Sequence, residues 1–246
     1  VNGDGYGDVI VGAYLNDAGG SNAGRAYIYF GGANMNNAAD VTLTGLAADN
    51  SFGFSVSTAG DFNGDGFSDV IVGAYLNNAG GAGAGRAYIF LGGSNMNNVA
   101  DVTLTGAAAG DNFGYSVSYA GDVNGDGFSD VIAGAMMNDG IATNAGRAYV
   151  YFGGVALNSV ADVVLNGVSA NDFFGHSVST AGDVNGDGYS DVIAGAPFND
   201  AAGNESGRAY LFLGGALMNN TADITITGAA AGDNLGHSVS TAGDIN

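Results

Sequence analysis

Apolar and polar residues follow one another in short runs along the whole chain, and the runs differ in kind. Residues 54–59 and 101–105 alternate between polar and apolar side chains, whereas residues 69–74 are apolar almost throughout. Residues 86–91 are rich in aromatic and β-branched side chains. Glycine-rich turns separate these runs, and no stretch of about ten residues shows helical periodicity. The pattern predicts four short strands, of which the second is buried on both faces.

This group of four strands recurs with a fixed period of 61 residues. The asparagines at equivalent places are Asn2, Asn63, Asn124, Asn185 and Asn246, and the four arginines at the same spacing are Arg25, Arg86, Arg147 and Arg208. Such a repeat predicts an all-β fold, a β-propeller of four-stranded blades with four repeats per chain. We expect residues 1–246 to form one module in which one blade is divided between the termini, with its first strand in residues 236–244 and its other three strands in residues 7–44. The near-constant unit length and the start within a motif suggest a duplicated, excised or engineered segment, and the sequence leaves these open.

The charge balance narrows the classes of partner. The chain has 24 acidic residues against four basic ones, for a formal net charge of −20 at pH 7. This excludes a basic nucleic-acid-binding surface. Carboxylates at this density repel one another unless a multivalent cation neutralises them. The apolar runs are too short to span a bilayer, so no membrane insertion is expected, and the absence of cysteine excludes disulfides and thiolate metal sites.

A short acidic loop follows the first predicted strand of each unit. In residues 61–69, carboxylate or amide side chains stand at loop positions 1, 3, 5 and 9, and a backbone carbonyl is available at position 7. Alternating oxygen donors around a glycine-rich turn suit a hard cation such as Ca²⁺. An EF-hand would have a glutamate at position 12, but Val72 stands there and a strand follows. Mg²⁺ is disfavoured because it takes fewer protein ligands, and metal-free turns are disfavoured because the carboxylates would repel.

The loops predict three complete calcium sites and a fourth rebuilt across the termini, all with a structural role. The ligands expected in the complete loops are Asp61, Asn63, Asp65, Phe67, Asp69, Asp122, Asn124, Asp126, Phe128, Asp130, Asp183, Asn185, Asp187, Tyr189 and Asp191, with the aromatic residues contributing carbonyl oxygens. The ligands expected in the divided loop are Asn2, Asp4, Tyr6, Asp8, Asp244 and Asn246, with either asparagine at the third position.

The motifs around these loops resemble a known repeat. Phe52-Gly53, the acidic loop and Gly73-Ala74-Tyr75 are similar to the FG-GAP repeat of integrin α-subunit propellers and their bacterial relatives. The last unit has Leu235-Gly236 instead of Phe-Gly. The resemblance implies a propeller whose Ca²⁺ loops lie between the first and second strands of each blade. Because relatives usually have seven blades, we expect eight blades as a closed homodimer, with a four-bladed ring of one chain or a fragment of a larger ring as the alternatives.

These observations lead to expectations about function. The leading interpretation is a calcium-stabilised, non-catalytic scaffold for binding or adhesion, secreted or at the cell surface, with a protein or glycan partner. The alternatives are a self-assembling half-propeller without a ligand and an accessory propeller of a larger secreted enzyme. The arginines are expected to pair with carboxylates or stack on tyrosines, and His176 and His237 to serve packing. The segments between the second and third strands vary most, which indicates either recognition or drift.

Overall fold

The computed structural model describes residues 1–244, and its regular elements there are β-strands that pair antiparallel in chain order. The first sheet has three strands, β1 (Val9–Ala13), β2 (Arg25–Tyr29) and β3 (Val41–Thr44). The second has β4 (Ser55–Gly60), β5 (Asp69–Ala74), β6 (Arg86–Phe90) and β7 (Val102–Thr105). The third has β8 (Phe113–Gly121), β9 (Asp130–Ala135), β10 (Arg147–Tyr151) and β11 (Val163–Asn166). The fourth has β12 (Ser177–Gly182), β13 (Asp191–Ala196), β14 (Arg208–Phe212) and β15 (Ile224–Thr227).

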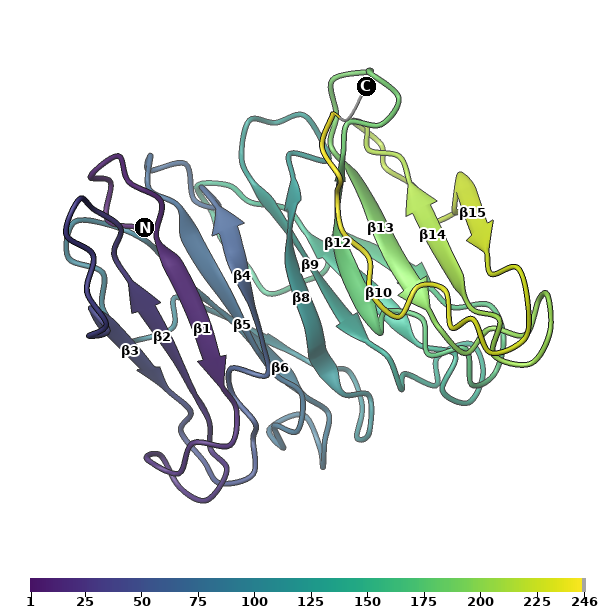
Figure 1. The fold of residues 1–246 in the computed structure, drawn as a ribbon, viewed down its shortest axis with the longest axis horizontal. Coiled ribbons are helices and arrows are strands. Elements are labelled where there is room, and N and C mark those ends of the chain that lie inside the picture. Colours follow the sequence, from purple (N-terminus) through teal and green to yellow (C-terminus); the bar gives the residue numbers. More distant parts are fainter. Residues whose placement is uncertain (245–246) are drawn as a thin grey trace.

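The prediction of four strands per repeat is confirmed in the three complete sheets, with bounds that differ little from those expected. The sheets stand side by side in a row, with the first strand of each complete sheet next to its counterpart in the adjacent sheet (Figure 1). Every residue of β5 and of β9 is buried, as predicted for the second strand. These strands are covered on both faces because each of these sheets lies between two neighbours.

The apolar core lies between the sheets. Each of its three clusters combines side chains from one face of a sheet with side chains from the opposing face of the next. Phe113, the aromatic residue of its Phe-Gly motif, is almost fully buried and contacts the rings of Tyr149 and Tyr151 edge-on, with centroids 5.5 and 6.2 Å apart. Phe52 and Phe174 occupy the same position in their clusters. Neighbouring sheets are thus held together by one recurring apolar interface.

Glycine permits the close approach of neighbouring sheets. A Cβ atom on Gly73 would overlap the carbonyl oxygen of Gly114 in the next sheet. Gly134 and Gly175 approach each other in the same way. The first glycine of each pair belongs to the Gly-Ala motif of one unit and the second to the Phe-Gly motif of the next. The two motifs are therefore the two sides of one backbone contact, which a side chain would push apart.

The two ends of the row are open, and one expectation is wrong there. Residues 236–244 were expected to form a first strand, but they form no strand and lie along β12, where the Thr241 hydroxyl donates to the Ala181 carbonyl at 3.3 Å. A strand requires a ladder partner, and the sheet that lacks a first strand, β1–β3, is at the opposite end of the row (Figure 1). The sheets do not close into a four-bladed ring within one chain.

We expect Phe113→Ala to lower the free energy of unfolding by about 3–5 kcal/mol, because it removes a fully buried ring and leaves a cavity between two sheets. Urea denaturation in calcium measures the change. Leu46→Ala is the control, since the Leu46 side chain is exposed, and its effect should stay within about 0.5 kcal/mol. A loss below about 1 kcal/mol for Phe113→Ala would contradict the view that this interface holds the sheets together.

Candidate metal centre

Glycines shape the three acidic loops. The loops join β4 to β5, β8 to β9 and β12 to β13, so each connects the first and second strands of a sheet. Gly64 and Gly66 have φ angles of 77° and 90°, in the left-handed region that glycine adopts without strain. The equivalent glycines of the other two loops have φ angles between 76° and 93°. The tight turn brings alternate side chains of each loop onto the same side of the backbone.

The carboxylates at positions 1 and 5 accept hydrogen bonds from the turn itself. The two oxygens of Asp61 accept from the backbone N–H groups of Asp65 and Gly66, each at 2.9 Å. One oxygen of Asp65 accepts from the N–H of Phe67 at 2.9 Å and the other from the amide of Asn63 at 2.9 Å. The loops that begin at Asp122 and Asp183 repeat these bonds.

The carboxylate at position 9 has a second role that the sequence did not reveal. Asp69 is fully buried, and its oxygens accept from the N–H of Phe62 at 2.8 Å and from the N–H of Gly92 at 2.7 Å. Asp130 and Asp191 are held in the same way. The acid therefore ties its loop to the end of the third strand. An aspartate at the start of a wholly buried strand was the signal that could have indicated this anchoring.

Burial and mutual repulsion act on these anchoring carboxylates. Desolvation raises the pKa of Asp69 to about 6 and the pKa of Asp130 to about 7. Backbone N–H donors oppose this rise, whereas the negative charges of Asp65 and Asp61 add to it around Asp69. The three acids of a loop are thus close enough to repel one another, and a bound cation would relieve both the repulsion and the cost of burial.

The donor chemistry of the loops fits a hard cation. Each complete loop offers carboxylate, amide and carbonyl oxygens, the ligand types that Ca²⁺ binds. Within residues 1–244, however, no three Asp, Glu or His side chains converge as a metal-holding group. The acids of positions 1 and 5 accept from their own turn, and the acid of position 9 accepts from a loop N–H and from the end of the third strand. The loops combine the expected oxygens with side chains that hydrogen-bond to the backbone.

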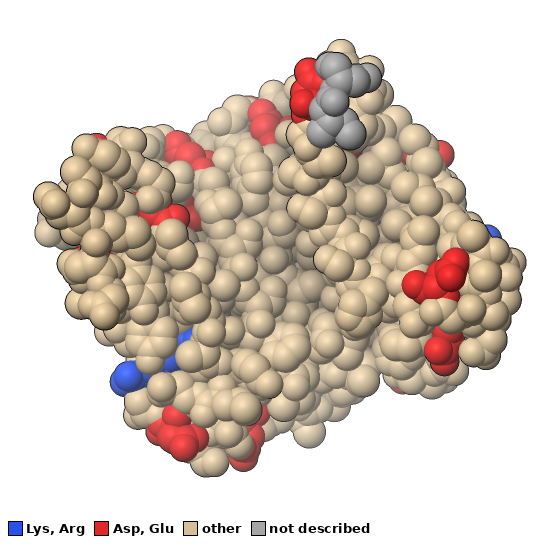
Figure 2. Space-filling view, viewed as in Figure 1, with Lys and Arg blue, Asp and Glu red and all other residues tan. Residues whose placement is uncertain are grey.

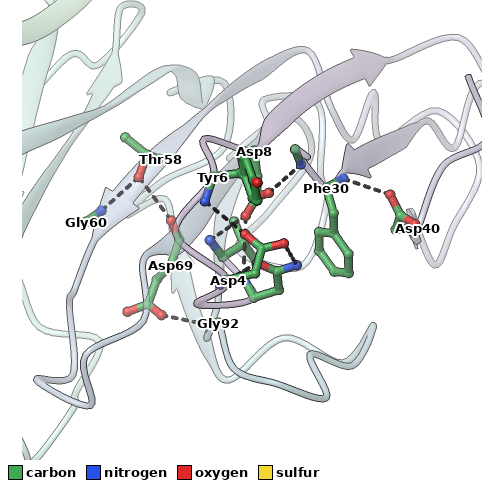
Figure 3. A network of polar contacts seen from close by, with 12 residues as sticks. Asp4, Tyr6, Asp8, Phe30, Asp40, Thr58, Gly60, Asp69 and Gly92 are labelled. Atoms are coloured by element: carbon green, nitrogen blue, oxygen red, sulfur yellow. Dashed lines mark hydrogen bonds and ion pairs between the residues drawn. The ribbon is translucent and has the colours of Figure 1, made fainter. Parts of the chain in front are cut away.

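The divided fourth loop is not assembled within one chain. Asp4 accepts from the N–H of Tyr6 at 2.9 Å, and Asp8 accepts from the N–H of Gly31 at 2.8 Å (Figure 3). Asp244 lies with Ala181 and Asp183 around one cavity next to β12, in the fourth sheet. Asn246 lies outside the described residues. The side-chain amide of Asn2 donates a hydrogen bond to the Asp4 carboxylate at 2.9 Å, as the amide of Asn63 does to Asp65.

Each loop is also joined to the next one along the row. The carbonyl oxygen of Asp61 accepts from the N–H of Ser129 at 3.1 Å, and that of Phe62 accepts from the N–H of Gly154 at 2.8 Å. A Cβ on Gly64 would overlap the Phe128 ring, so this ring covers the Gly64 turn. The same contacts link the second loop to the third. This coupling could not be predicted from the sequence because the partners belong to different repeats.

The arginines do not pair as expected. Their Nε atoms donate to side-chain oxygens on the last strand of the same sheet, at 2.8–3.2 Å, and the acceptors are Thr44, Thr105, Asn166 and Thr227. No arginine–carboxylate ion pair occurs among residues 1–244. The strand register explains this, since each arginine stands directly opposite its neutral acceptor. The expectation of carboxylate pairing was therefore wrong. The alternative of a tyrosine contact is met by Arg147, which lies beside Tyr149, and by Arg208, which lies beside Tyr210.

The two histidines continue a row of aromatic rings at the opposite ends of the first strands from the loops. His176 packs against Tyr115, with ring centroids 5.2 Å apart, and against His237 at 4.6 Å. Phe54 precedes them in the row, 4.9 Å from Tyr115. Burial lowers the pKa of His176, and the nearby His237 adds to this effect. The packing role expected of the histidines agrees with this arrangement.

Charged side chains are unevenly spread over the surface. Figure 2 shows acidic residues in clusters at the rim of the face viewed in Figure 1, and uncharged residues over its middle. The acidic side chains visible on this face therefore lie at its rim.

A family model described as the FG-GAP repeat matches residues 1–29, 52–90, 113–151 and 174–212. The chain is 35% identical to integrin alpha-PS2 of Drosophila melanogaster over 68% of its length and 32% identical to integrin alpha-6 of Homo sapiens over 74%. It is 34% identical to integrin alpha-5 of Xenopus laevis over 59%. The matched parts span 12%, 15% and 14% of these relatives.

The anchoring carboxylates should make the metal-free protein less stable as the pH rises. Asp130 has a pKa of about 7 when folded and an ordinary value of 3.8, so between these values the folded state holds a proton that the unfolded state has lost. The free energy of unfolding then falls as the pH rises from about 4 to about 7. Melting in chelator should show this decline.

Asp130→Asn, which cannot ionise, should flatten the decline, whereas the exposed Glu205→Gln should not. The asparagine variant should be about 1–3 kcal/mol less stable at low pH, because an amide offers only one acceptor to two buried N–H groups. Parallel pH profiles for Asp130→Asn and the unaltered chain would contradict this cause.

Proposed function

Because the chain belongs to the FG-GAP repeat family, we propose that it is a calcium-stabilised β-propeller scaffold that acts by binding rather than by catalysis. The observation that carries the proposal is the acidic loop itself. Three loops of the same geometry each combine oxygen donors with a buried carboxylate. Burial and the acidic neighbours raise the pKa of this carboxylate at Asp69 and at Asp130. Such a loop gains more from a bound cation than an exposed turn would.

The chain's own residues have distinct tasks in this proposal. Asp61, Asn63, Asp65 and the Phe67 carbonyl would hold the ion, and Asp69 would contribute from the base of the loop while it keeps its bonds to Phe62 and Gly92. The ion supplies positive charge and fixes the turn. The loop in turn fixes the adjacent sheet, since carbonyl oxygens of residues 61 and 62 accept from N–H groups beyond β8 and β10.

The partner class follows from the relatives and from the variable loops. Integrin alpha chains are the relatives at 30–35% identity, which supports an adhesion-type scaffold with a protein or glycan ligand. The segments between the second and third strands, such as residues 75–85, lie at the opposite end of the sheets from the metal loops and differ between units. They are the recognition surface of this proposal.

A secreted or cell-surface location belongs to the same proposal. Loops of this type need plentiful calcium, as extracellular modules do. In residues 1–244, no helix is long and apolar enough to cross a membrane.

The proposed assembly is a closed homodimer of eight blades, in which residues 1–246 form one module with a divided blade. The row of sheets is open, the first sheet lacks a first strand, and residues 236–244 form no strand. Joining two chains would satisfy both ends, and an unpaired sheet edge is otherwise a site of aggregation.

Calcium should set the stability of the protein. Binding to the folded state alone adds about 2.7 kcal/mol per site at 100-fold saturation, so the melting temperature should fall sharply in chelator and recover with Ca²⁺. An unchanged midpoint after verified metal removal would contradict the proposal. In a calorimetric titration with Ca²⁺, the Asp126→Ala variant should bind one ion fewer per chain. The Glu205→Gln variant also loses one negative charge but lies outside the acidic loops, and it should keep all of the sites.

The homodimer predicts a mass of twice 24.1 kDa by light scattering coupled to size exclusion in calcium. Two chains close the row because each supplies the strands that the other lacks. A mass near one chain that persists at high protein concentration would refute the dimer.

A further inference from the structure

A cavity of about 160 Å³ opens between the first and second sheets. It is bounded by the end of β3, by the residues that precede β4, by β6 and by the loop before β7. The rings of Phe52, Tyr88 and Phe90 form its aromatic wall. All of its lining residues lie between Thr44 and Ala100, so both of its walls belong to sheets within the chain.

One polar side chain lines this cavity without a partner. Asn50 is only 6% exposed. Its side chain forms no hydrogen bond with any other residue of the described range 1–244. A buried amide that is left without a partner is costly, so a ligand group that bonds to Asn50 would supply what the folded chain does not.

The next two interfaces show why this amide is left over. At the equivalent position of the second interface stands Asp111, which accepts from the side-chain amide of Asn138 at 2.8 Å. Asp172 is held in the same way in the third interface. Among the described residues, no such bond joins Asn50 to Asn77, the residue that matches Asn138. An amide in place of the carboxylate thus leaves a polar group of the first interface free for a ligand.

Water is a poor occupant of this cavity. A buried water typically makes about three hydrogen bonds to polar groups that would otherwise lack a partner. The hydroxyls of Thr44 and Tyr88 line the cavity, but each already accepts from a side chain of its own unit at 3.2 Å. Asn98, which also lines it, is exposed. An apolar molecule with a single polar group matches these walls better than water does.

The walls also set the chemistry of that molecule. No charged side chain of the described chain lines the cavity, so a charged ligand would lose its hydration without gaining a partner. The Phe52 ring lies 5.6 Å from Tyr88, tilted, and 6.2 Å from Phe90, edge-on. A further aromatic ring packs well against such a group. Because a cavity of about 150 Å³ with apolar walls takes up benzene, the space admits one six-membered ring.

We propose that this cavity binds one neutral phenol ring, which packs against Phe52 and Phe90 and whose hydroxyl bonds to the Asn50 side chain. A hydroxyl and a carboxamide are each both donor and acceptor. Leu46 and Val99 line the cavity and are 90% and 68% exposed, so they form its mouth. The site goes beyond the scaffold role proposed above, and it depends neither on calcium nor on dimerisation, because its lining includes no residue of an acidic loop.

Binding of p-cresol and toluene, which differ only in the hydroxyl, tests the role of Asn50. Calorimetric or NMR titration in calcium should show one p-cresol site per chain. In Asn50→Leu, which is close in size but cannot hydrogen-bond, the preference for p-cresol over toluene should fall about tenfold. Asn95→Leu makes the same change at an exposed position outside the cavity and is the control. A preference that is unchanged in Asn50→Leu, or more than one site per chain, overturns the proposal.

The location of the ring is tested without a variant and then with one. Nuclear Overhauser contacts should join p-cresol to the Phe52 and Phe90 rings of the unaltered chain. Ala100→Leu fills the cavity that Ala100 lines and should weaken binding of both ligands about tenfold or more. Ala161→Leu, the same change at the equivalent position of the next interface, should not. Overhauser contacts elsewhere, or full binding by a folded Ala100→Leu variant, overturn the site.

A peptide separates the two sources of a phenol ring. Displacement of p-cresol by a blocked Gly-Tyr-Gly peptide, but not by Gly-Phe-Gly, identifies the tyrosine side chain of a partner protein as an occupant. Binding of p-cresol that the peptide does not displace identifies a free small phenol. If p-cresol does not bind, the proposal is wrong, and a melting temperature that still responds to chelator would leave the calcium proposal standing.

Discussion

The packing of one sheet against the next is the contact on which this structure depends. Each complete sheet has two apolar faces, and the residues of β5 and β9 are buried only because a neighbour covers each side. A single sheet of this sequence could not bury both faces. The stability of each sheet therefore comes from its neighbours, as in other repeat proteins, and the loops and strand ends are arranged around that interface.

Close packing between sheets also explains the two motifs that recur in the chain. The glycine of Gly-Ala in one unit lies against the glycine of Phe-Gly in the next, and the phenylalanine beside the second glycine fills the apolar core. The spacing of the motifs along the chain follows from this contact. The acidic loop lies at the other end of the same strands, where its carbonyl oxygens bond to the following sheet. Neighbouring sheets are thus joined by three kinds of contact: apolar packing, the close approach of two glycines, and hydrogen bonds from the acidic loop.

The strands and the shape of the acidic loop could be predicted because each depends on residues that are close together in the sequence. Alternation of side chains reports the exposure of each strand, and the donor spacing of residues 61–69 is contained within the loop. The partners of Arg147 and Asp130 could not be predicted, because the acceptor of the first is set by strand register and the donors of the second are a loop residue and Gly153, 23 residues away. The strand expected at residues 236–244 required a partner that lies at the far end of the row.

The recurrence of a single interface also bears on how many units such a protein has. Every contact between sheets joins one unit to the next, so deletion or insertion of a whole 61-residue unit would leave each remaining contact intact. None of the described side-chain contacts depends on the total number of units. Their number is limited by the rotation from one sheet to the next, summed around the axis, and a change of a few degrees in that rotation selects a ring of different size. Repeat number in this architecture is thus a geometric property of the interface, open to change by duplication without any redesign of the core.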